Sequence, residues 1–224
     1  MIISRAYPYR FELFFFSQLA ILFGSLFIPF AIFDTILNPL FFIINLMAGI
    51  VLISKSRPKM WFFVLLLIFS GFIFSRDLIE GYKDHYIEFL KLGIYFSFYV
   101  FVTIEVVKQV WKSTHINKNT MLGLVSGYVS IGLLGFFLCL TIEMISPGSF
   151  FSSHFDLNNI ENKNDVLMYF SYITLLSIGY GDIIPLSSLA QKATVLIGLI
   201  GQIYLVIITG IVIGKYLNQL PRKN

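Results

Sequence analysis

The run TLLSIGYGD at residues 174–182 lies between two apolar segments and decides how the rest of the chain is interpreted. Its two glycines, Gly179 and Gly181, are separated by one residue, and glycine adopts left-handed backbone dihedrals without a side-chain clash. A segment that alternates between ordinary and left-handed dihedrals turns consecutive carbonyl oxygens toward one side. The run is therefore compatible with a segment whose carbonyl oxygens form a row along one side. A tight turn between helices is the alternative.

The sequence on either side of this run fits the first interpretation. Upstream, Asn164 or Asp165 can cap a helix over residues 166–174, which is too short to span a bilayer. A re-entrant half-helix is permitted in a membrane when protein surrounds it, and the partial negative charge at its C-terminal end favours a cation beyond it. Downstream of Pro185, residues 190–214 are long and apolar enough to cross the membrane.

The composition is that of an integral membrane protein. Hydrophobic residues make up 57% of the 224 residues, charged residues make up 12%, and the mean hydropathy is +0.83. We therefore expect an all-α membrane protein with six transmembrane helices and one re-entrant helix. The expected spans are about 11–33, 38–54, 60–79, 87–111, 121–145 and 190–214.

The basic residues are distributed unevenly between the two sides of these spans. With a cytoplasmic N-terminus, eleven of the sixteen lysines and arginines fall on the inner side, as is typical of short loops. We therefore expect a multi-pass protein of the cell membrane with both termini in the cytoplasm. The net charge of +4 then reflects orientation and contact with anionic membrane lipid, and no nucleic-acid partner is expected.

The run at 174–182 resembles the selectivity filter of potassium channels, which has the consensus Thr-Val-Gly-Tyr-Gly. Ser177 and Ile178 stand where this consensus has threonine and valine. The resemblance implies that ions bind to the backbone of five residues: Ser177, Ile178, Gly179, Tyr180 and Gly181. It places potassium at the first four of them. It also implies that Tyr180 points away from the axis and that the Ser177 hydroxyl adds the innermost ring of ligands.

Residues 121–217 resemble the two-helix pore module of bacterial potassium channels. The implied domains are a four-helix N-terminal region at 1–115 and a pore domain at 116–224. Within the pore domain, the resemblance places an outer helix at 121–145, a pore helix at 165–176, the filter at 177–182 and an inner helix at 190–217. One filter per chain lines only a quarter of a fourfold pore, so the resemblance also implies a homotetramer.

Four residues outside the carbonyl row are expected to support the filter: Thr174, Asp182, Tyr169 and Glu143. Many relatives carry tryptophan at the positions of Tyr169 and Phe170, and Tyr169 is the candidate to replace that donor to Asp182. Glu143 either ties the outer helix to the outer mouth or is a simple interfacial carboxylate. Leu176 replaces a threonine that is usual in relatives, so a weakly selective cation channel is an alternative function.

The inner helix contains candidates for a gating hinge. Relatives commonly bend at a glycine about twenty positions after the last filter glycine, and Gly201 occupies this position. Gly198, Gly210 and Gly214 compete with it, and close helix packing is an equally good explanation of all four. Gln202 is polar at the middle of the expected span, where an amide needs either a partner or a water-filled cavity.

The first four helices resemble those of voltage-gated relatives only in number. The expected fourth helix, residues 87–111, contains Lys91, Glu105 and Lys108 but no arginine at every third position, so we do not expect voltage sensing. Snorkelling to the interface explains the two lysines, which lie near the helix ends. Few residues follow Gly214, and no soluble ligand-binding domain is expected there.

An enzyme and a non-conducting accessory subunit are the other classes of function to consider. An intramembrane enzyme needs an activated nucleophile or a metal, but His85, His115 and His154 fall in predicted loops without ligand-like spacing to other residues. We therefore expect no catalysis, no cofactor, and no metal other than permeant potassium. The intact filter run argues against an accessory subunit.

Overall fold

The computed structural model describes residues 5–29, 32–80, 85–152 and 160–219. It divides the chain into two units, of which unit 1 extends to Gly127 and unit 2 begins at Tyr128. Unit 1 contains, in chain order, η1 (Tyr7–Tyr9), α2 (Arg10–Phe23), η2 (Gly24–Leu26), η3 (Phe33–Leu37), α4 (Asn38–Ile53), α5 (Arg57–Glu80) and α6 (His85–Lys112). Helix α7 (Lys118–Ile145) begins in unit 1 and continues into unit 2. Unit 2 then contains β1 (Phe150–Ser152), α8 (Ile160–Leu175), β2 (Ile183–Pro185), α9 (Ser188–Ile203), η4 (Tyr204–Ile208) and α10 (Thr209–Gln219).

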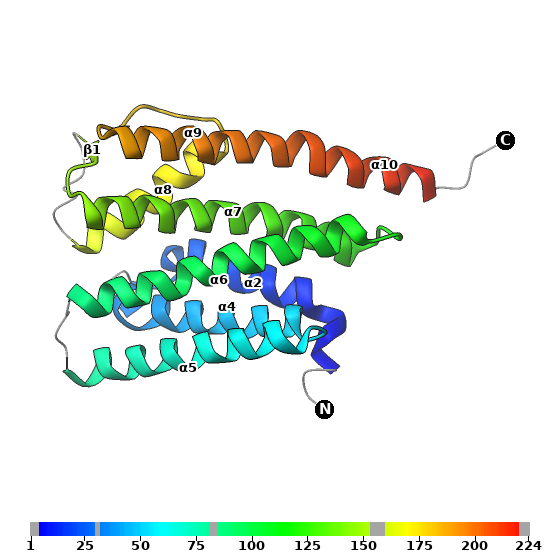
Figure 1. Cartoon of the computed structure of the whole chain (residues 1–224), viewed down its shortest axis with the longest axis horizontal. Coiled ribbons are helices and arrows are strands. Elements are labelled where there is room, and N and C mark those ends of the chain that lie inside the picture. Colours follow the sequence, from blue (N-terminus) through cyan, green and yellow to red (C-terminus); the bar gives the residue numbers. More distant parts are fainter. Residues whose placement is uncertain (1–4, 30–31, 81–84, 153–159, 220–224) are drawn as a thin grey trace. The chain divides into compact units, whose positions relative to one another are not determined.

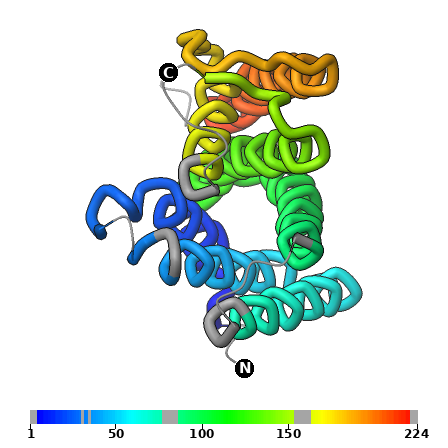
Figure 2. The backbone as a smooth tube through the Cα atoms, turned by 90° about the vertical axis from the view of Figure 1, so that its left-hand side faces the viewer, coloured from blue at the N-terminus to red at the C-terminus, as the bar shows by residue number. Residues whose placement is uncertain are grey.

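Unit 1 is a helical bundle in which α4 contacts α2, α5 and α6 (Figure 2). Its core is aromatic. Phe63 and Phe14 both pack edge-on against Phe98, with ring centroids 5.2 and 6.4 Å away. All three rings are buried, and aromatic rings contribute both large apolar area and specific edge-to-face contacts.

Polar groups in the core of unit 1 are paired with one another. Asn45 of α4 is fully buried, and its Nδ2 donates a hydrogen bond to Ser17 Oγ at 2.8 Å. Its Oδ1 accepts a hydrogen bond from Tyr99 OH of α6 at 2.8 Å. Because polar groups remote from water must be satisfied inside the protein, these bonds allow α2, α4 and α6 to carry polar side chains in an apolar bundle.

Four helices of the described residues are long and apolar enough to cross a membrane: Arg57–Arg76, Tyr86–Lys112, Lys118–Ile145 and Ser188–Gln219. They correspond to four of the six predicted spans. The predicted span at 38–54 forms α4, which has 16 residues and is shorter than a typical span. The predicted span at 11–33 is not one helix, because α2 ends at Phe23 and a 3-10 turn follows it.

Gly24 and Pro29 account for this break in the first apolar run. A Cβ atom at Gly24 would lie 2.4 Å from Cε2 of Phe33, so only glycine lets the Phe33 ring pack against the turn. Pro29 has no backbone N–H to continue a helix. A hydropathy average contains neither the close contact at Gly24 nor the missing N–H of Pro29, so the sequence predicts a single span there.

In unit 2, α8 lies between α7 and α9 (Figures 1 and 2). Glycines of α7 let α8 approach closely: a Cβ at Gly132 would lie 2.3 Å from the Tyr172 ring, and one at Gly135 would lie 2.4 Å from Ser171 Oγ. The same two side chains bond to the α7 backbone. Tyr172 OH donates to the Val129 carbonyl and Ser171 Oγ donates to the Gly132 carbonyl, both at 2.7 Å. These contacts fix α8 against α7.

The helices of the predicted pore domain have different bounds from the predicted ones. Helix α8 covers Ile160–Leu175 rather than 165–176, because the residues before the expected caps include good helix formers such as Lys163 and extend the helix upstream. The outer helix begins at Lys118 rather than 121, and the inner helix runs from Ser188 through Gln219 rather than from 190 to 217. The all-α prediction also omits a small antiparallel sheet, in which Phe151 of β1 lies opposite Ile184 of β2.

Candidate functional site

The segment between α8 and β2 has alternating backbone conformations. Positive φ angles occur at Ser177 (56°), Gly179 (56°) and Gly181 (82°), which is every second residue of the segment. The glycine spacing predicts the last two. Ser177 is not predicted, because a residue with a Cβ atom occupies the left-handed region at a cost of about 1–2 kcal/mol. The alternation therefore extends one step further toward α8 than the glycines alone indicate.

The N–H groups at the start of this segment all point back to α8. Leu176 N donates to the Tyr172 carbonyl at 2.9 Å, and Ile178 N donates to the Ile173 carbonyl at 2.9 Å. Within the described part of the chain, no hydrogen bond engages the carbonyl oxygens of residues 177–180. Their side chains are exposed in the single chain. The N–H groups of residues 176–179 are thus hydrogen-bonded to α8, and the carbonyl oxygens of residues 177–180 are available for a ligand.

Helix α8 ends at Leu175, immediately before this row of oxygens. The negative end of its dipole is therefore next to the place where the acceptors begin, and such an end stabilises a cation. Thr174 contacts the segment through its backbone: its carbonyl oxygen accepts a hydrogen bond from Ser177 N at 3.0 Å. This bond anchors the strained Ser177 to the last turn of α8. Support of the filter by Thr174 stays a prediction.

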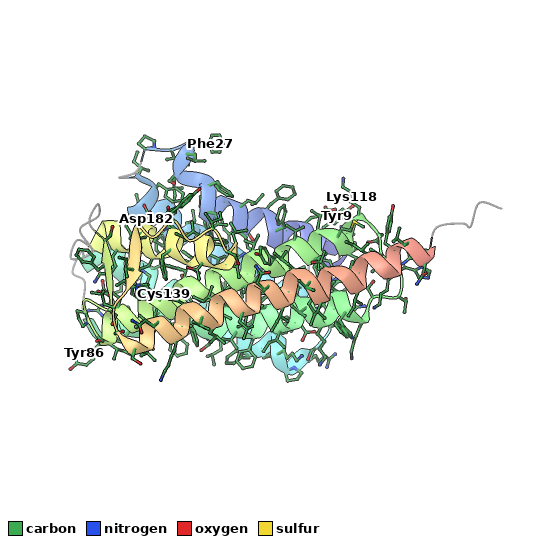
Figure 3. The ribbon with its side chains drawn as sticks, turned by 90° about the horizontal axis from the view of Figure 1, so that it is seen from above. Tyr9, Phe27, Tyr86, Lys118, Cys139 and Asp182 are labelled. Atoms are coloured by element: carbon green, nitrogen blue, oxygen red, sulfur yellow. The ribbon has the colours of Figure 1, made fainter. Side chains whose placement is uncertain are left out.

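The outer end of the segment is held by a hydrogen bond between Tyr169 and Asp182. Figure 3 labels Asp182. Tyr169 OH of α8 donates a hydrogen bond to Asp182 Oδ2 at 2.8 Å, which is the pairing that the sequence predicts. This bond raises the pKa of Tyr169, because ionisation of the phenol would remove the proton that Asp182 accepts. The phenol therefore keeps its proton at neutral pH. The other oxygen, Asp182 Oδ1, is buried and has no partner among the described residues.

Glu143 connects α7 to the strand that pairs beside the carbonyl row. Its side chain is 3% exposed, and its two oxygens accept hydrogen bonds from Gly148 N at 2.7 Å and Phe150 N at 3.1 Å. Phe150 begins β1, which pairs with β2 directly after Asp182. Of the two alternatives that the sequence leaves open, this geometry favours the tie to the outer mouth.

Gly201 packs against the end of α8. A Cβ atom there would lie 2.6 Å from the Leu175 carbonyl oxygen. At Gly198 the nearest atom would be the Thr174 carbonyl oxygen at 3.9 Å, and nothing lies within 4 Å of Gly210 or Gly214 in the single chain. Close packing therefore explains Gly201 but not the other three. A hinge at Gly201 stays a prediction, and the π-helical segment η4 begins only three residues after it.

Gln202 has a partner in the carbonyl-row segment. Its Nε2 donates a hydrogen bond to Ser177 Oγ at 2.6 Å, so the amide nitrogen has a partner, which is one of the two alternatives that the sequence leaves open. Two further contacts near this point have no motif in the sequence that would predict them. Tyr128 OH donates to the Leu175 carbonyl at 3.1 Å, and the Tyr128 and Tyr204 rings lie 5.6 Å apart between centroids.

The histidines do not form a metal site among the residues that can be examined. His85 begins α6 rather than lying in a loop, His115 lies between α6 and α7, and His154 is outside the described residues. No group of three His, Cys, Asp or Glu side chains with metal-binding geometry occurs in the described ranges.

The comparisons with known proteins bear on the segment just described. Residues 150–218 match the ion channel family. The matched region runs from β1 through most of α10 and includes the whole carbonyl row. No curated protein and no solved structure matches the chain significantly. Together with the long apolar helices, the match shows a multi-pass membrane protein that carries an ion channel domain and is not an enzyme.

Proposed function

We propose that the chain is a potassium-selective channel that conducts potassium passively through the carbonyl row at residues 177–181. The observation that carries this proposal is the alternation of φ at Ser177, Gly179 and Gly181 within the ion channel domain. Rings of neutral carbonyl oxygens suit potassium, which exchanges its hydration shell for them without a strongly charged site. The GYGD sequence supports potassium as the ion.

The working unit of this proposal is a homotetramer. Each chain supplies one carbonyl row, and a closed ring of four is the symmetric way to surround an ion. Two features of the single chain support an assembly. The Tyr180 side chain is 72% exposed, although its proposed role is to wedge the filter against surrounding helices. Apolar residues of the inner helix are exposed as well, including Val195 and Val206.

The proposed orientation places both termini in the cytoplasm of the cell. The support is the excess of lysine and arginine on that side of the spans. Cysteine accessibility at an added N-terminal or C-terminal cysteine, measured with a membrane-impermeant thiol reagent on intact cells, tests the orientation. Labelling of either terminus from outside would contradict it.

The reversal potential of the purified protein in planar bilayers tests the function. With potassium on one side and sodium on the other, we expect a value near the potassium equilibrium potential. A value near zero with clear single-channel steps would instead favour a weakly selective cation channel, the alternative that Ser177 and Leu176 keep open. An absence of current under voltage, tension or acid would favour an accessory subunit.

We expect conduction to depend little on voltage. The buried residues of α6 include Phe98, Val102, Val106 and Val110, and no charged residue is buried in the described part of this helix. Glu105 of the same helix is paired with Lys59 of α5. One charge moved across the field would change the open probability roughly 50-fold per 100 mV. Steady-state recordings between about −100 and +100 mV, a range that includes resting potentials, would contradict this expectation if they showed such steepness.

Replacing Tyr169 with phenylalanine is expected to destabilise the conducting state of the filter. Tyr169→Phe removes the donor to Asp182 Oδ2, and the described residues supply no donor to Asp182 Oδ1. The Asp182 carboxylate would then have no hydrogen bond from the described residues. We therefore expect sustained potassium current to decay several-fold faster than in the wild type. Tyr216→Phe makes the same chemical change in α10 and serves as the control. Equal decay in the wild type and both variants would argue against a bracing role for Tyr169.

A further inference from the structure

Gln202 and Ser177 bring two polar side chains together in the middle of an apolar span. The hydrogen bond from Gln202 Nε2 to Ser177 Oγ measures 2.6 Å. Gln202 lies 14 residues after Ser188, or about 21 Å along the helix, in a span that ends at Gln219. Ser177 is the first residue of the carbonyl row with a left-handed conformation. The pair therefore marks the inner end of that row.

The neighbours of Gln202 explain why its amide reaches Ser177. Gly201, the preceding residue, packs against the Leu175 carbonyl and brings α9 close to the end of α8. Ser177 follows Leu175 by two residues, so the next side chain of α9 is within reach of it. Close helix packing thus brings these two exposed side chains within hydrogen-bonding distance.

The bond has two effects on Ser177. It engages the hydroxyl oxygen, which orients the side chain. It also adds to the bond from Ser177 N to the Thr174 carbonyl, so that both the backbone and the side chain hold this residue at a φ of 56°. Without such support, a non-glycine residue in this conformation relaxes to a more ordinary one.

The pairing leaves half of the Gln202 amide available. Oε1 of Gln202 makes no hydrogen bond within the described residues, and the side chain is exposed in the single chain. An amide oxygen has the same chemistry as a backbone carbonyl: it is neutral, it is a good hydrogen-bond acceptor, and it suits monovalent cations better than a carboxylate does. At this depth in a membrane, an amide oxygen without a partner is costly unless a cation or water meets it.

We propose that Gln202 is a specificity-determining residue, and that its amide oxygen adds a ligand for a partly dehydrated potassium ion just inside the carbonyl row. The inference rests on the proposed tetrameric channel, in which four copies form a ring together with four Ser177 hydroxyls. The ring extends the filter by one layer of neutral oxygens. It favours potassium over sodium because the larger ion gives up its water more readily to such ligands.

The test compares two variants of Gln202 in single-channel recordings. Gln202→Leu removes both the donor and the amide oxygen at similar size. We expect single-channel potassium conductance to fall at least about threefold and the potassium-to-sodium permeability ratio to fall several-fold. Gln202→Glu keeps the shape but places a carboxylate at each of four positions. We expect block by magnesium from the cytoplasmic side at concentrations at least about tenfold lower than in the wild type, because carboxylates bind this cation.

Gln191→Leu is the matched control, because Gln191 lies on the same helix near its outer end, where it bonds to the Pro185 carbonyl. We expect this variant to have the single-channel conductance of the wild type. Block by cytoplasmic magnesium is also expected to be unchanged. A wild type that conducts no potassium would overturn the proposed channel and this inference together. A conducting wild type with unchanged conductance, selectivity and magnesium block in both Gln202 variants would overturn the inference alone. If Gln202→Leu does not assemble, the magnesium block of Gln202→Glu decides the matter.

Discussion

Replacing Gly201 with alanine is expected to abolish most conduction and to destabilise unit 2. The added Cβ atom would lie 2.6 Å from the Leu175 carbonyl oxygen and 2.8 Å from Leu175 Cδ1. The side chain can rotate, but the carbonyl cannot move freely, because it ends α8 and accepts the hydrogen bond from Tyr128 OH. Overpacking of this kind costs about 1–3 kcal/mol. Either α9 moves outward or the start of the carbonyl row is displaced.

The displacement would have a functional effect beyond stability. Ser177 begins the carbonyl row two residues after Leu175, and Gln202 reaches Ser177 only because α9 is close. We therefore expect Gly201→Ala to lower single-channel conductance about tenfold or more, and to lower the thermal unfolding midpoint of the purified protein. Size-exclusion chromatography of the same sample reports whether the assembly survives.

Gly198→Ala is the control for this prediction. Its Cβ atom would lie 3.9 Å from the Thr174 carbonyl oxygen, which is an ordinary contact, and alanine favours a helix by about 1 kcal/mol over glycine. We expect Gly198→Ala to conduct normally and to be at least as stable as the wild type. If Gly201 acts instead as a gating hinge, Gly201→Ala will leave stability and assembly unchanged and alter only the open probability. That pattern would contradict the packing explanation.

The sequence predicts the local chemistry of the site better than its surroundings. The spacing of Gly179 and Gly181 indicates the alternating backbone, and the placement of Tyr169 before Asp182 indicates their hydrogen bond. Both depend on residues close in the chain whose types carry the information. The positive φ of Ser177 is not predictable in this way, because Ser177 is held by a bond that its N–H donates to the Thr174 carbonyl and by a bond that it accepts from Gln202 on another helix.

The span count shows a different limit. Hydropathy reports how much apolar sequence is available but not where a helix breaks, so the run at 11–33 is predicted as one span although α2 ends at Phe23. The break depends on Gly24 approaching Phe33, which lies nine residues further along the chain. The buried polar pairs of unit 1, such as Tyr99 with Asn45, are likewise set by tertiary packing and have no sequence motif.

Replacing Glu143 with alanine is expected to lower the stability of unit 2 and to disturb the outer end of the carbonyl row. The buried carboxylate accepts hydrogen bonds from Gly148 N and Phe150 N, and its removal leaves two N–H groups without acceptors. Hydrogen bonds to charged groups contribute about 1.5–3 kcal/mol each, so we expect a loss of about 3 kcal/mol or more. For a chain of this size, the thermal unfolding midpoint then falls by about 6 °C or more.

The position of β1 makes this loss a functional one. Phe150 begins β1, and β1 pairs with β2 directly after Asp182, while Leu186 N donates to the Ser149 carbonyl at 2.7 Å. Releasing the turn at Gly148 therefore loosens the strand that ends the carbonyl row, and we expect potassium current to become unstable over time. Glu143→Gln retains one acceptor oxygen but presents an NH₂ group to the second N–H, so its effect falls between those of the wild type and alanine.

Glu105→Ala is the control for Glu143→Ala. It shows what the loss of a carboxylate near a membrane surface does when that carboxylate does not hold the turn before β1. Glu105 of α6 pairs with Lys59, whose side chain is 46% exposed, and an exposed ion pair contributes about 0–1 kcal/mol. We expect this variant to unfold within a few degrees of the wild type and to conduct steadily. If Glu143 were only an interfacial carboxylate, the two alanine variants would behave alike. A large difference between them, with the current of Glu143→Ala unstable, follows only if the carboxylate holds the turn before β1.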